Sequence, residues 1–184
     1  MDARGWVPAT AGNISLRLEP EVIAITASGG HKGFLNANQV MCVDLAGAPL
    51  SAGRPSAETL LHCQIYRLFP SAGAVLHGHS VTGTVLSMAT DAAEINFANY
   101  ELLKAFEGQT THATVLSLPL VDNDQDIAAL ARVMEPRLAN AKLGYLIRGH
   151  GVYVWGPDMA TALARLEGLE FLLACELERR KVAR

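Results

Sequence analysis

The chain has 184 residues, of which 50% are hydrophobic and 18% are charged, and its formal net charge is −3 at pH 7. This composition is typical of a globular protein, and the length suits a single domain, residues 1–184, with a full hydrophobic core. The 15 Lys and Arg residues are fewer than the 18 Asp and Glu residues. Because no basic stripe is present to neutralise a phosphate backbone, we expect no nucleic-acid partner.

The cysteines and the hydrophobic runs indicate the cellular compartment of the protein. Cys42, Cys63 and Cys175 are widely spaced and form no C-x-x-C pair, which fits neither a disulfide framework nor a cysteine zinc site. The N-terminus has no apolar signal core, and no stretch approaches the roughly 20 apolar residues that span a bilayer. We therefore expect a cytoplasmic protein without membrane association.

Two glycine-containing turns near the N-terminus each border a predicted strand. Residues 10–15 lead into an alternating segment, and residues 27–33 follow the apolar run 22–26. Both are ordinary turn sequences. Alternatively, they form nests of backbone N–H groups that bind an anion such as phosphate. Lys32 is then either a solvated charge or a phosphate ligand.

Five helices are predicted further along the chain. The first opens at Ser56, a good N-cap, and Glu58 in its first turn is explained by the helix dipole. Others are expected over residues 80–88 and 96–106, and after an acidic cap at residues 122–124. The Glu101–Lys104 spacing is adequately explained as a surface ion pair. A final helix is expected from Pro157 onward.

The sequence His77-Gly78-His79 follows a short apolar segment and is the strongest candidate for chemistry. In an extended segment these two side chains point to the same face, with Cβ atoms roughly 7 Å apart. Two imidazoles at that spacing can reach one zinc ion, with Zn–N distances of about 2.0–2.1 Å. The alternative is a pair of solvated or hydrogen-bonded histidines.

A third histidine lies between two later apolar strands. Glycines flank His150 in the sequence 148–151, which predicts a tight hairpin with His150 at its tip. A lone histidine there would be a turn residue, but beside the first pair it is the natural third ligand. Strands alternate with helices and also form hairpin-like pairs, which predicts a mixed sheet covered by helices.

These segments resemble the class II aldolase and adducin-head family over nearly the whole chain. The shared motifs lie at residues 5–15, 28–33, 55–59, 77–80, 122–126 and 148–156. The opening at residues 5–8, the run 122–124 and the strand 152–156 favour the dehydratase branch, which removes water from 5-methylthioribulose 1-phosphate. The resemblance implies a three-layer α/β/α fold with a mostly antiparallel sheet, and a homo-oligomer, commonly a tetramer, with sites near subunit contacts.

The resemblance also implies roles for individual residues. One Zn²⁺ per subunit would be held by His77, His79 and His150. Glu101 matches the acid/base glutamate of the dehydratases, and Glu58 matches the glutamate of the sugar-phosphate aldolases. The residues implied near the substrate phosphate are Thr10, Gly12, Asn13, Ser28, Gly29, Lys32 and Ser56.

Two alternative functions stay open from sequence. The first is a zinc-dependent sugar-phosphate aldolase or epimerase with the same metal site. The second is a metal-free association module like the adducin head, against which the presence of all three histidines speaks.

Overall fold

The protein is described by a computed structural model covering residues 1–182, and over that range the strands form one eight-stranded sheet. The strand order is β3-β2-β1-β4-β8-β7-β6-β5. Among the described strands, β6 and β7 pair in parallel and all other neighbours are antiparallel. The strands are β1 (Asn13–Glu19), β2 (Val22–Thr26), β3 (Val40–Asp44), β4 (Ala74–Gly78), β5 (Glu94–Ala98), β6 (Val115–Val121), β7 (Tyr145–Ile147) and β8 (Val152–Gly156).

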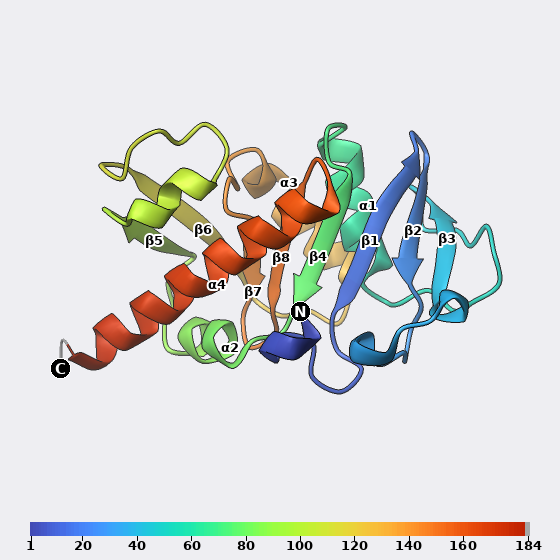
Figure 1. Ribbon diagram of the computed structural model, residues 1–184, viewed down its shortest axis with the longest axis horizontal. Coiled ribbons are helices and arrows are strands. Elements are labelled where there is room, and N and C mark those ends of the chain that lie inside the picture. Colours follow the sequence, from blue (N-terminus) through green and yellow to red (C-terminus); the bar gives the residue numbers. More distant parts are fainter. Residues whose placement is uncertain (183–184) are drawn as a thin grey trace.

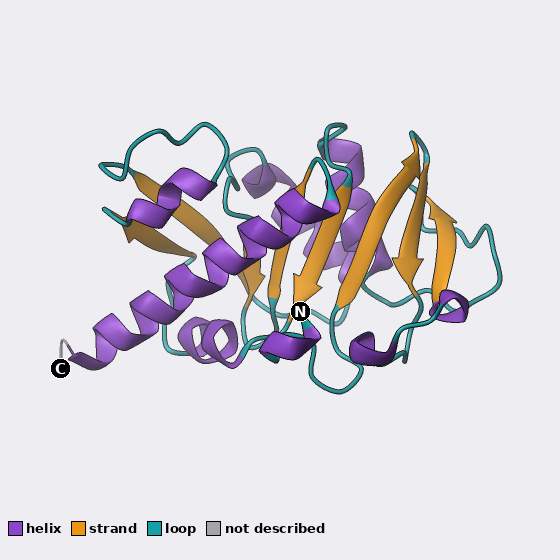
Figure 2. Cartoon of the chain, in the orientation of Figure 1, coloured by secondary structure: helices purple, strands orange, loops and turns teal. Residues whose placement is uncertain are grey.

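Helices cover both faces of this sheet, which confirms the predicted three-layer fold (Figures 1 and 2). Helices α1 (Thr59–Leu68) and α3 (Ile127–Leu138) pack on one face, and α2 (Val81–Met88) and α4 (Met159–Val182) on the other. Short 3-10 segments are η1 (Asp2–Arg4), η2 (Lys32–Phe34), η3 (Ala37–Gln39) and η4 (Glu101–Ala105).

The two hydrophobic cores follow from the alternation of side chains along the strands. In β4, Val75 packs into the core under α1 and α3, whereas Ala74 and Leu76 pack into the core under α4. All three are buried, as expected for a central strand covered on both faces.

The helix predicted over residues 96–106 is wrong. The structure has strand β5, then a tight turn, then the 3-10 segment η4. In β5 only Ile95 and Phe97 are buried, so the period is two and the segment pairs with β6 at the edge of the sheet. The helix-like spacing of Glu101 and Lys104 belongs to one short 3-10 turn.

Helix starts differ from prediction by a few residues. Helix α1 begins at Thr59 rather than directly after Ser56, and α4 begins at Met159, two residues beyond Pro157. The cap of α3 is Asp126, whose carboxylate accepts from the Ala129 N–H at 3.0 Å. The α2 prediction is confirmed, since Ser80 caps it through the Gly83 N–H at 2.9 Å.

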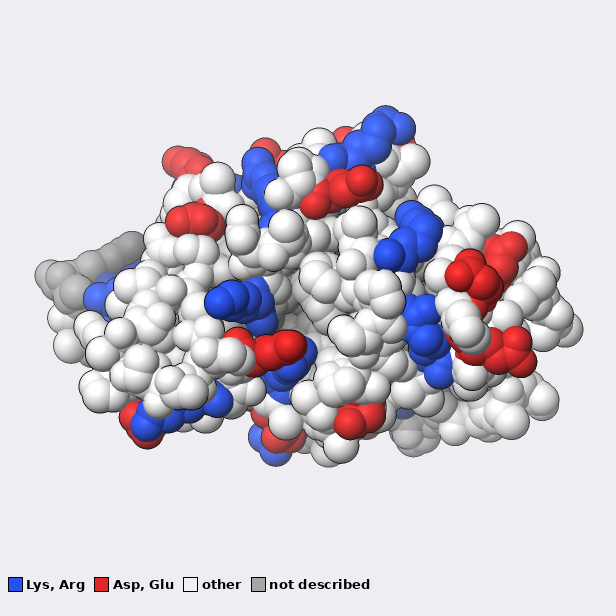
Figure 3. Space-filling model, turned by 90° about the horizontal axis from the view of Figure 1, so that it is seen from above, with Lys and Arg blue, Asp and Glu red and all other residues white. Residues whose placement is uncertain are grey.

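One end of the sheet gathers loops from distant parts of the chain. Strands β2, β4 and β7 end there, while β1 and β8 begin there, because β1 and β8 both run antiparallel to β4. Strand β6 is parallel to β7 and β5 is antiparallel to β6, so β5 ends at the opposite end. Within residues 1–182 no helix is long and apolar enough to span a bilayer. On the face in Figure 3, charges of both signs are interspersed among uncharged residues.

Candidate active site

Four side chains meet at the loop-rich end of the sheet. Glu58, His77, His79 and His150 each offer one ligand atom, and these atoms lie within 4.8 Å of one another. His77 lies in β4 and His79 just beyond it, His150 lies in the β7–β8 turn, and Glu58 directly precedes α1. The three imidazoles expected to converge from sequence do so, and Glu58 joins them. These four side chains are called the histidine cluster below.

His77 is oriented with one nitrogen toward the cluster. Its side chain is fully buried, and Nδ1 lies 2.9 Å from the carbonyl oxygen of Val152. A carbonyl only accepts, so Nδ1 carries the proton and Nε2 has its lone pair available. Nε2 has no hydrogen-bond partner among the described residues, although a Glu58 oxygen lies 3.4 Å away.

His150 is held by its turn and by Asn123. Its Nδ1 lies 3.3 Å from the Asn123 side-chain oxygen, and its Nε2 lies 2.7 Å from a Glu58 oxygen. Arg148 fixes the turn by donating to the Asp122 carboxylate at 2.7 Å and to the Ser87 carbonyl at 2.7 Å. The run 122–124, interpreted from sequence as a helix cap, therefore supports this turn.

The protonation states of the side chains in the histidine cluster are compatible with binding a metal cation. Burial acts to raise the pKa of Glu58, but the hydrogen bond with His150 and the charge interactions with His77 and His150 outweigh it and hold that pKa far below its ordinary value. Asn13 also donates to the Glu58 carboxylate, at 2.5 Å. Burial, followed by the charges of His77 and His150, lowers the pKa of His79 to about 3. His79 is therefore neutral at pH 7 and Glu58 is ionised.

These donors fit a zinc ion. Neutral imidazole nitrogens and a carboxylate oxygen are among the ligands zinc prefers, and three histidines leave a position for substrate or water. A buried His77 Nε2 without a hydrogen-bond partner in the described chain is the atom such an ion would satisfy.

A pocket of about 260 Å³ opens beside the histidine cluster. It brings together all seven residues that the family resemblance implies near the substrate phosphate, with Glu58 and His79 on its wall. Its lining residues are Thr10, Ala11, Gly12, Asn13, Ser28, Gly29, Lys32, Ser56, Glu58 and His79. Gly12 has φ +77, and a Cβ there would lie 2.8 Å from the His77 carbonyl oxygen. The first turn thus lies close against β4 because Gly12 has no side chain.

Lys32 connects the two glycine-containing turns. Only 8% of it is exposed, and its Nζ donates to the carbonyl oxygens of Thr10 at 2.8 Å and Gly30 at 2.9 Å. Burial lowers the pKa of Lys32, and the nearby charge of Glu58 acts in the opposite direction. The alternative of a fully solvated lysine is therefore wrong, and a cation lies at the wall of the pocket.

Glu101 lies far from the histidine cluster of its own chain. It follows β5, the edge strand four positions from β4, at the opposite end of the sheet. Four strand spacings alone correspond to roughly 19 Å. Its carboxylate is exposed and accepts from Lys104 Nζ at 2.6 Å, with His112 at 3.7 Å. In Figure 1 this yellow-green segment lies above β5.

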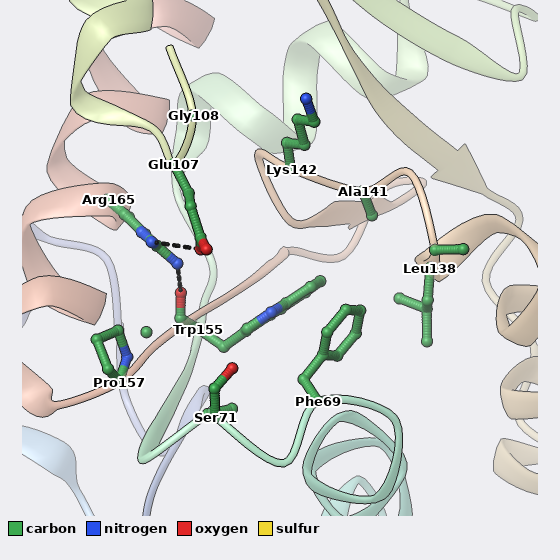
Figure 4. A pocket seen from close by; sticks show the side chains of 13 residues that line it. Phe69, Ser71, Glu107, Gly108, Leu138, Ala141, Lys142, Trp155, Pro157 and Arg165 are labelled. Atoms are coloured by element: carbon green, nitrogen blue, oxygen red, sulfur yellow. Dashed lines mark hydrogen bonds and ion pairs between the residues drawn. The ribbon is translucent and has the colours of Figure 1, made fainter.

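A second cavity, of about 370 Å³, lies at the end of the sheet away from the histidine cluster (Figure 4). The Trp155 and Phe69 rings form its floor, 4.9 Å apart between centroids. Arg165 donates to the Trp155 carbonyl and pairs with Glu107, each at 3.0 Å. One side of this cavity is polar and the other side is apolar. The cavity and the histidine cluster lie at opposite ends of β4 and β8.

Sequence reasoning assigned no individual role to three residues that lie against the imidazoles or their turn. Asn123, Arg148 and Tyr153 contact the cluster or its turn, yet each has an ordinary local explanation as a cap, turn or strand residue. A usable signal was that residues 148–153 combine a cation, two glycines and one tyrosine around one histidine.

Comparison with known proteins defines the class. The sequence profile of the class II aldolase and adducin N-terminal domain matches residues 1–177. The chain belongs to this family. L-fuculose-1-phosphate aldolase from Thermus thermophilus has the same fold, with a TM-score of 0.79 and 24% identity over 99% of this chain and 90% of that one. YgbL from Escherichia coli superposes with a TM-score of 0.79 at 27% identity, over 95% of this chain and 81% of that one.

Two relatives with higher sequence identity to this chain share one protein name. Methylthioribulose-1-phosphate dehydratase of Granulibacter bethesdensis is 67% identical over 99% of this chain and 88% of that protein. Methylthioribulose-1-phosphate dehydratase of Gluconobacter oxydans is 66% identical over 97% of this chain and 86% of that protein.

Proposed function

We propose that this chain is a lyase that dehydrates 5-methylthioribulose 1-phosphate to 2,3-diketo-5-methylthiopentyl 1-phosphate, a step of methionine salvage. The single observation that carries the proposal is the convergence of three histidines beside a pocket built from two glycine-containing turns and Lys32. The names of relatives at up to 67% identity supply the substrate. The three free cysteines in the described chain favour a reducing, cytoplasmic setting.

The histidine cluster would hold one Zn²⁺ per subunit through His77, His79 and His150. When bound, zinc supplies a Lewis acid that draws electron density from the substrate's C2 carbonyl. The hydrogen bond from His77 Nδ1 to Val152 would leave the lone pair of the other ring nitrogen available to such an ion.

The pocket residues would bind the phosphate. Lys32 contributes a positive charge, and Thr10, Ser28 and Ser56 contribute hydroxyl groups at the same wall. Gly12 and Gly29 allow backbone N–H groups to approach an anion closely. Anchoring the phosphate fixes the sugar carbons relative to the histidine cluster, which lowers the entropic part of the barrier.

Dehydration also needs a group that moves protons between C3 and the departing C4 hydroxyl. We infer that Glu101 does this in a site of a neighbouring copy, because its own cluster lies at the opposite end of the sheet. A positioned acid/base group contributes about 10²–10⁴-fold in rate. The proposed assembly is a homotetramer.

The surface next to the histidine cluster is suited to such an assembly. Val81, Val85 and Met88 form an exposed apolar stripe along α2, and α2 begins two residues after His79 with Ser80 as its cap. A contiguous exposed apolar surface is typical of a protein–protein contact. A neighbour packed on this stripe would lie within reach of the pocket.

A second candidate function is favoured by the position of Glu58. Its carboxylate lies within the cluster, 2.7 Å from His150 Nε2, and the family's sugar-phosphate aldolases use a glutamate at this position. Such an enzyme would break or rearrange a C–C bond instead of losing water. In a metal-free association module the cluster would hold no ion, and elemental analysis of the purified protein distinguishes that case.

The test is an assay of the purified protein with 5-methylthioribulose 1-phosphate, monitoring diketone formation and C–C cleavage separately. We expect diketone formation that a chelator abolishes and added zinc restores. Cleavage products without diketone would support the aldolase candidate, and activity indifferent to chelation would contradict the metal centre.

A further inference from the structure

A row of three stacked rings extends from the histidine cluster into the core of the sheet. His77, Tyr153 and Tyr145 occupy directly paired positions on the adjacent strands β4, β8 and β7. The His77 and Tyr153 rings are 4.1 Å apart between centroids at an angle of 17°. The Tyr153 and Tyr145 rings are 4.8 Å apart at 6°. Sheet register therefore brings a metal-site histidine into face-to-face contact with Tyr153.

The Tyr153 ring is enclosed on several sides. His77 covers one face, Tyr145 covers the other, and the His62 ring meets it edge-on with centroids 5.5 Å apart. His62 is itself fixed, because its Nδ1 lies 2.7 Å from the Ser15 hydroxyl. The side chains of His62, His77, Tyr145 and Tyr153 are all fully buried. A fully buried ring that is contacted on both faces and at one edge is a rigid surface for its neighbour.

The hydrogen bond to Val152 alone does not determine the plane of the His77 ring. It fixes which nitrogen carries the proton and roughly where that nitrogen points. The imidazole can still tilt about this bond, and tilting moves Nε2 away from the other cluster atoms. Contact with the flat Tyr153 ring removes that freedom.

We propose that Tyr153 is a positioning residue for the metal centre: its ring fixes the plane of the His77 imidazole so that Nε2 faces His79, His150 and Glu58. The ring rather than the hydroxyl makes this contact, and the hydroxyl has no hydrogen-bond partner in residues 1–182. The inference rests on the metal centre proposed above, since it concerns how tightly that centre binds its ion.

Tyr145 provides a matched control. It is as buried as Tyr153, stacks on the same ring, and its hydroxyl likewise lacks a partner within the described range. The Tyr153 ring separates it from His77. Replacing either tyrosine by leucine removes similar buried aromatic area, so the two variants lose stability in similar measure, but only one removes the contact with His77.

The experiment measures Zn²⁺ affinity of the full chain by competition with a chromogenic chelator, together with urea unfolding of the metal-free protein. Tyr153→Leu is expected to weaken zinc binding by about 10–100-fold, the effect typical of losing a group that orients a ligand. Tyr145→Leu and Tyr153→Phe are expected to bind zinc as the parent does. If Tyr153→Leu does not fold, Tyr153→Met gives the same comparison with a more adaptable side chain.

Three outcomes would overturn the inference. Equal losses of affinity in Tyr153→Leu and Tyr145→Leu would show general loosening of the core. A loss in Tyr153→Phe as large as in Tyr153→Leu would assign the effect to the hydroxyl. Parent-like affinity in Tyr153→Leu would remove the role altogether. If the parent protein itself binds no zinc, the metal centre fails first, which separates the two proposals.

Discussion

Glu58 and Glu101 are both matched by resemblance to catalytic glutamates of the family. Their surroundings in the fold differ, because one side chain is largely buried and the other is exposed. The Glu58 side chain is 15% exposed and is held by Asn13 and His150 at the loop-rich end of the sheet. The Glu101 side chain is 72% exposed and is paired only with neighbours on the surface, Lys104 and His112, among the residues described. Glu58 is thus in place in one chain, whereas Glu101 is presented outward.

The difference shows which parts of the proposed site one chain completes alone. The proposed metal ligands and the proposed phosphate pocket come from loops at one end of one sheet. Strand direction puts the end of β5, and therefore Glu101, at the other end. No side-chain motion spans the roughly 19 Å of intervening strands. A dehydratase that uses Glu101 must therefore be an oligomer.

The largest effect is expected from removing a cluster histidine. His77→Ala deletes a buried ligand nitrogen, so both bound zinc and diketone formation should fall to background. Elemental analysis and the dehydration assay measure the two together. His31→Ala is the matched control, since His31 accepts from the Gly33 N–H outside the cluster, and it should retain zinc. Full zinc content with full turnover in His77→Ala would contradict the site.

Glu101→Gln should reduce turnover by about 10²–10⁴-fold while zinc content and stability stay unchanged. The carboxylate is exposed, so the substitution leaves no buried group unpaired. Steady-state kinetics and thermal unfolding give the comparison. A variant working at the parent rate would transfer the acid/base role to Glu58.

Mixed oligomers make the same comparison sharper. Glu101→Gln subunits carry an intact histidine cluster, and His77→Ala subunits carry an intact Glu101. If Glu101 acts in a neighbouring site, co-refolding the two inactive variants should restore a fraction of parent activity. Mixed oligomers that remain inactive would show that the acid/base group and the cluster do not meet across subunits.

Lys32→Met should mainly affect substrate binding. A charge-assisted hydrogen bond of about 1.5–3 kcal/mol corresponds to a KM increase of roughly 10–100-fold. Lys142→Met is a suitable control, because Lys142 is an exposed lysine at the wall of the second cavity, and its KM should not change. An unaltered KM in Lys32→Met, with the zinc content of the parent, would remove Lys32 from the phosphate site.

The sequence was sufficient for the parts of this site that depend on local geometry. His77 and His79 converge because alternate residues of an extended chain share a face, and glycines around His150 predict its turn. Burial of Lys32 was not predictable, because one of the carbonyls that bind it comes from the other turn. Strand order is equally non-local: nothing near Tyr153 in sequence indicates that β8 pairs with β4.

Glu101 shows in another way how far local sequence patterns predict structure. Its spacing to Lys104 predicted a helical surface pair, and the pair is present at 2.6 Å although the helix is not. The alternation of Ile95 and Phe97 was the competing signal, and it covered too few residues to outweigh helical spacing over residues 96–106. A local pattern can be right about a contact and wrong about the element that makes it.

A third carboxylate extends the comparison and should give the smallest effect. Glu170 in α4 is 5% exposed, and burial raises its pKa to about 7, against a hydrogen bond with Ser80 that lowers it. Between its ordinary pKa of 4.5 and about 7 the unfolded chain ionises first, so Glu170 lowers the free energy of unfolding as pH rises through this window, and the penalty is complete above it.

Glu170→Gln should therefore be more stable than the parent at pH 8 by roughly 1–3 kcal/mol, with the difference vanishing near pH 4. Urea unfolding across this pH range measures it. Glu176→Gln is the control: Glu176 is equally buried but accepts from Tyr100 at 2.8 Å and from Arg179 at 2.7 Å, so its replacement should destabilise the fold. If Glu170→Gln is less stable than the parent at pH 8, the ionised carboxylate holds Ser80 and the loop after His79 in place, and burial is not its main effect.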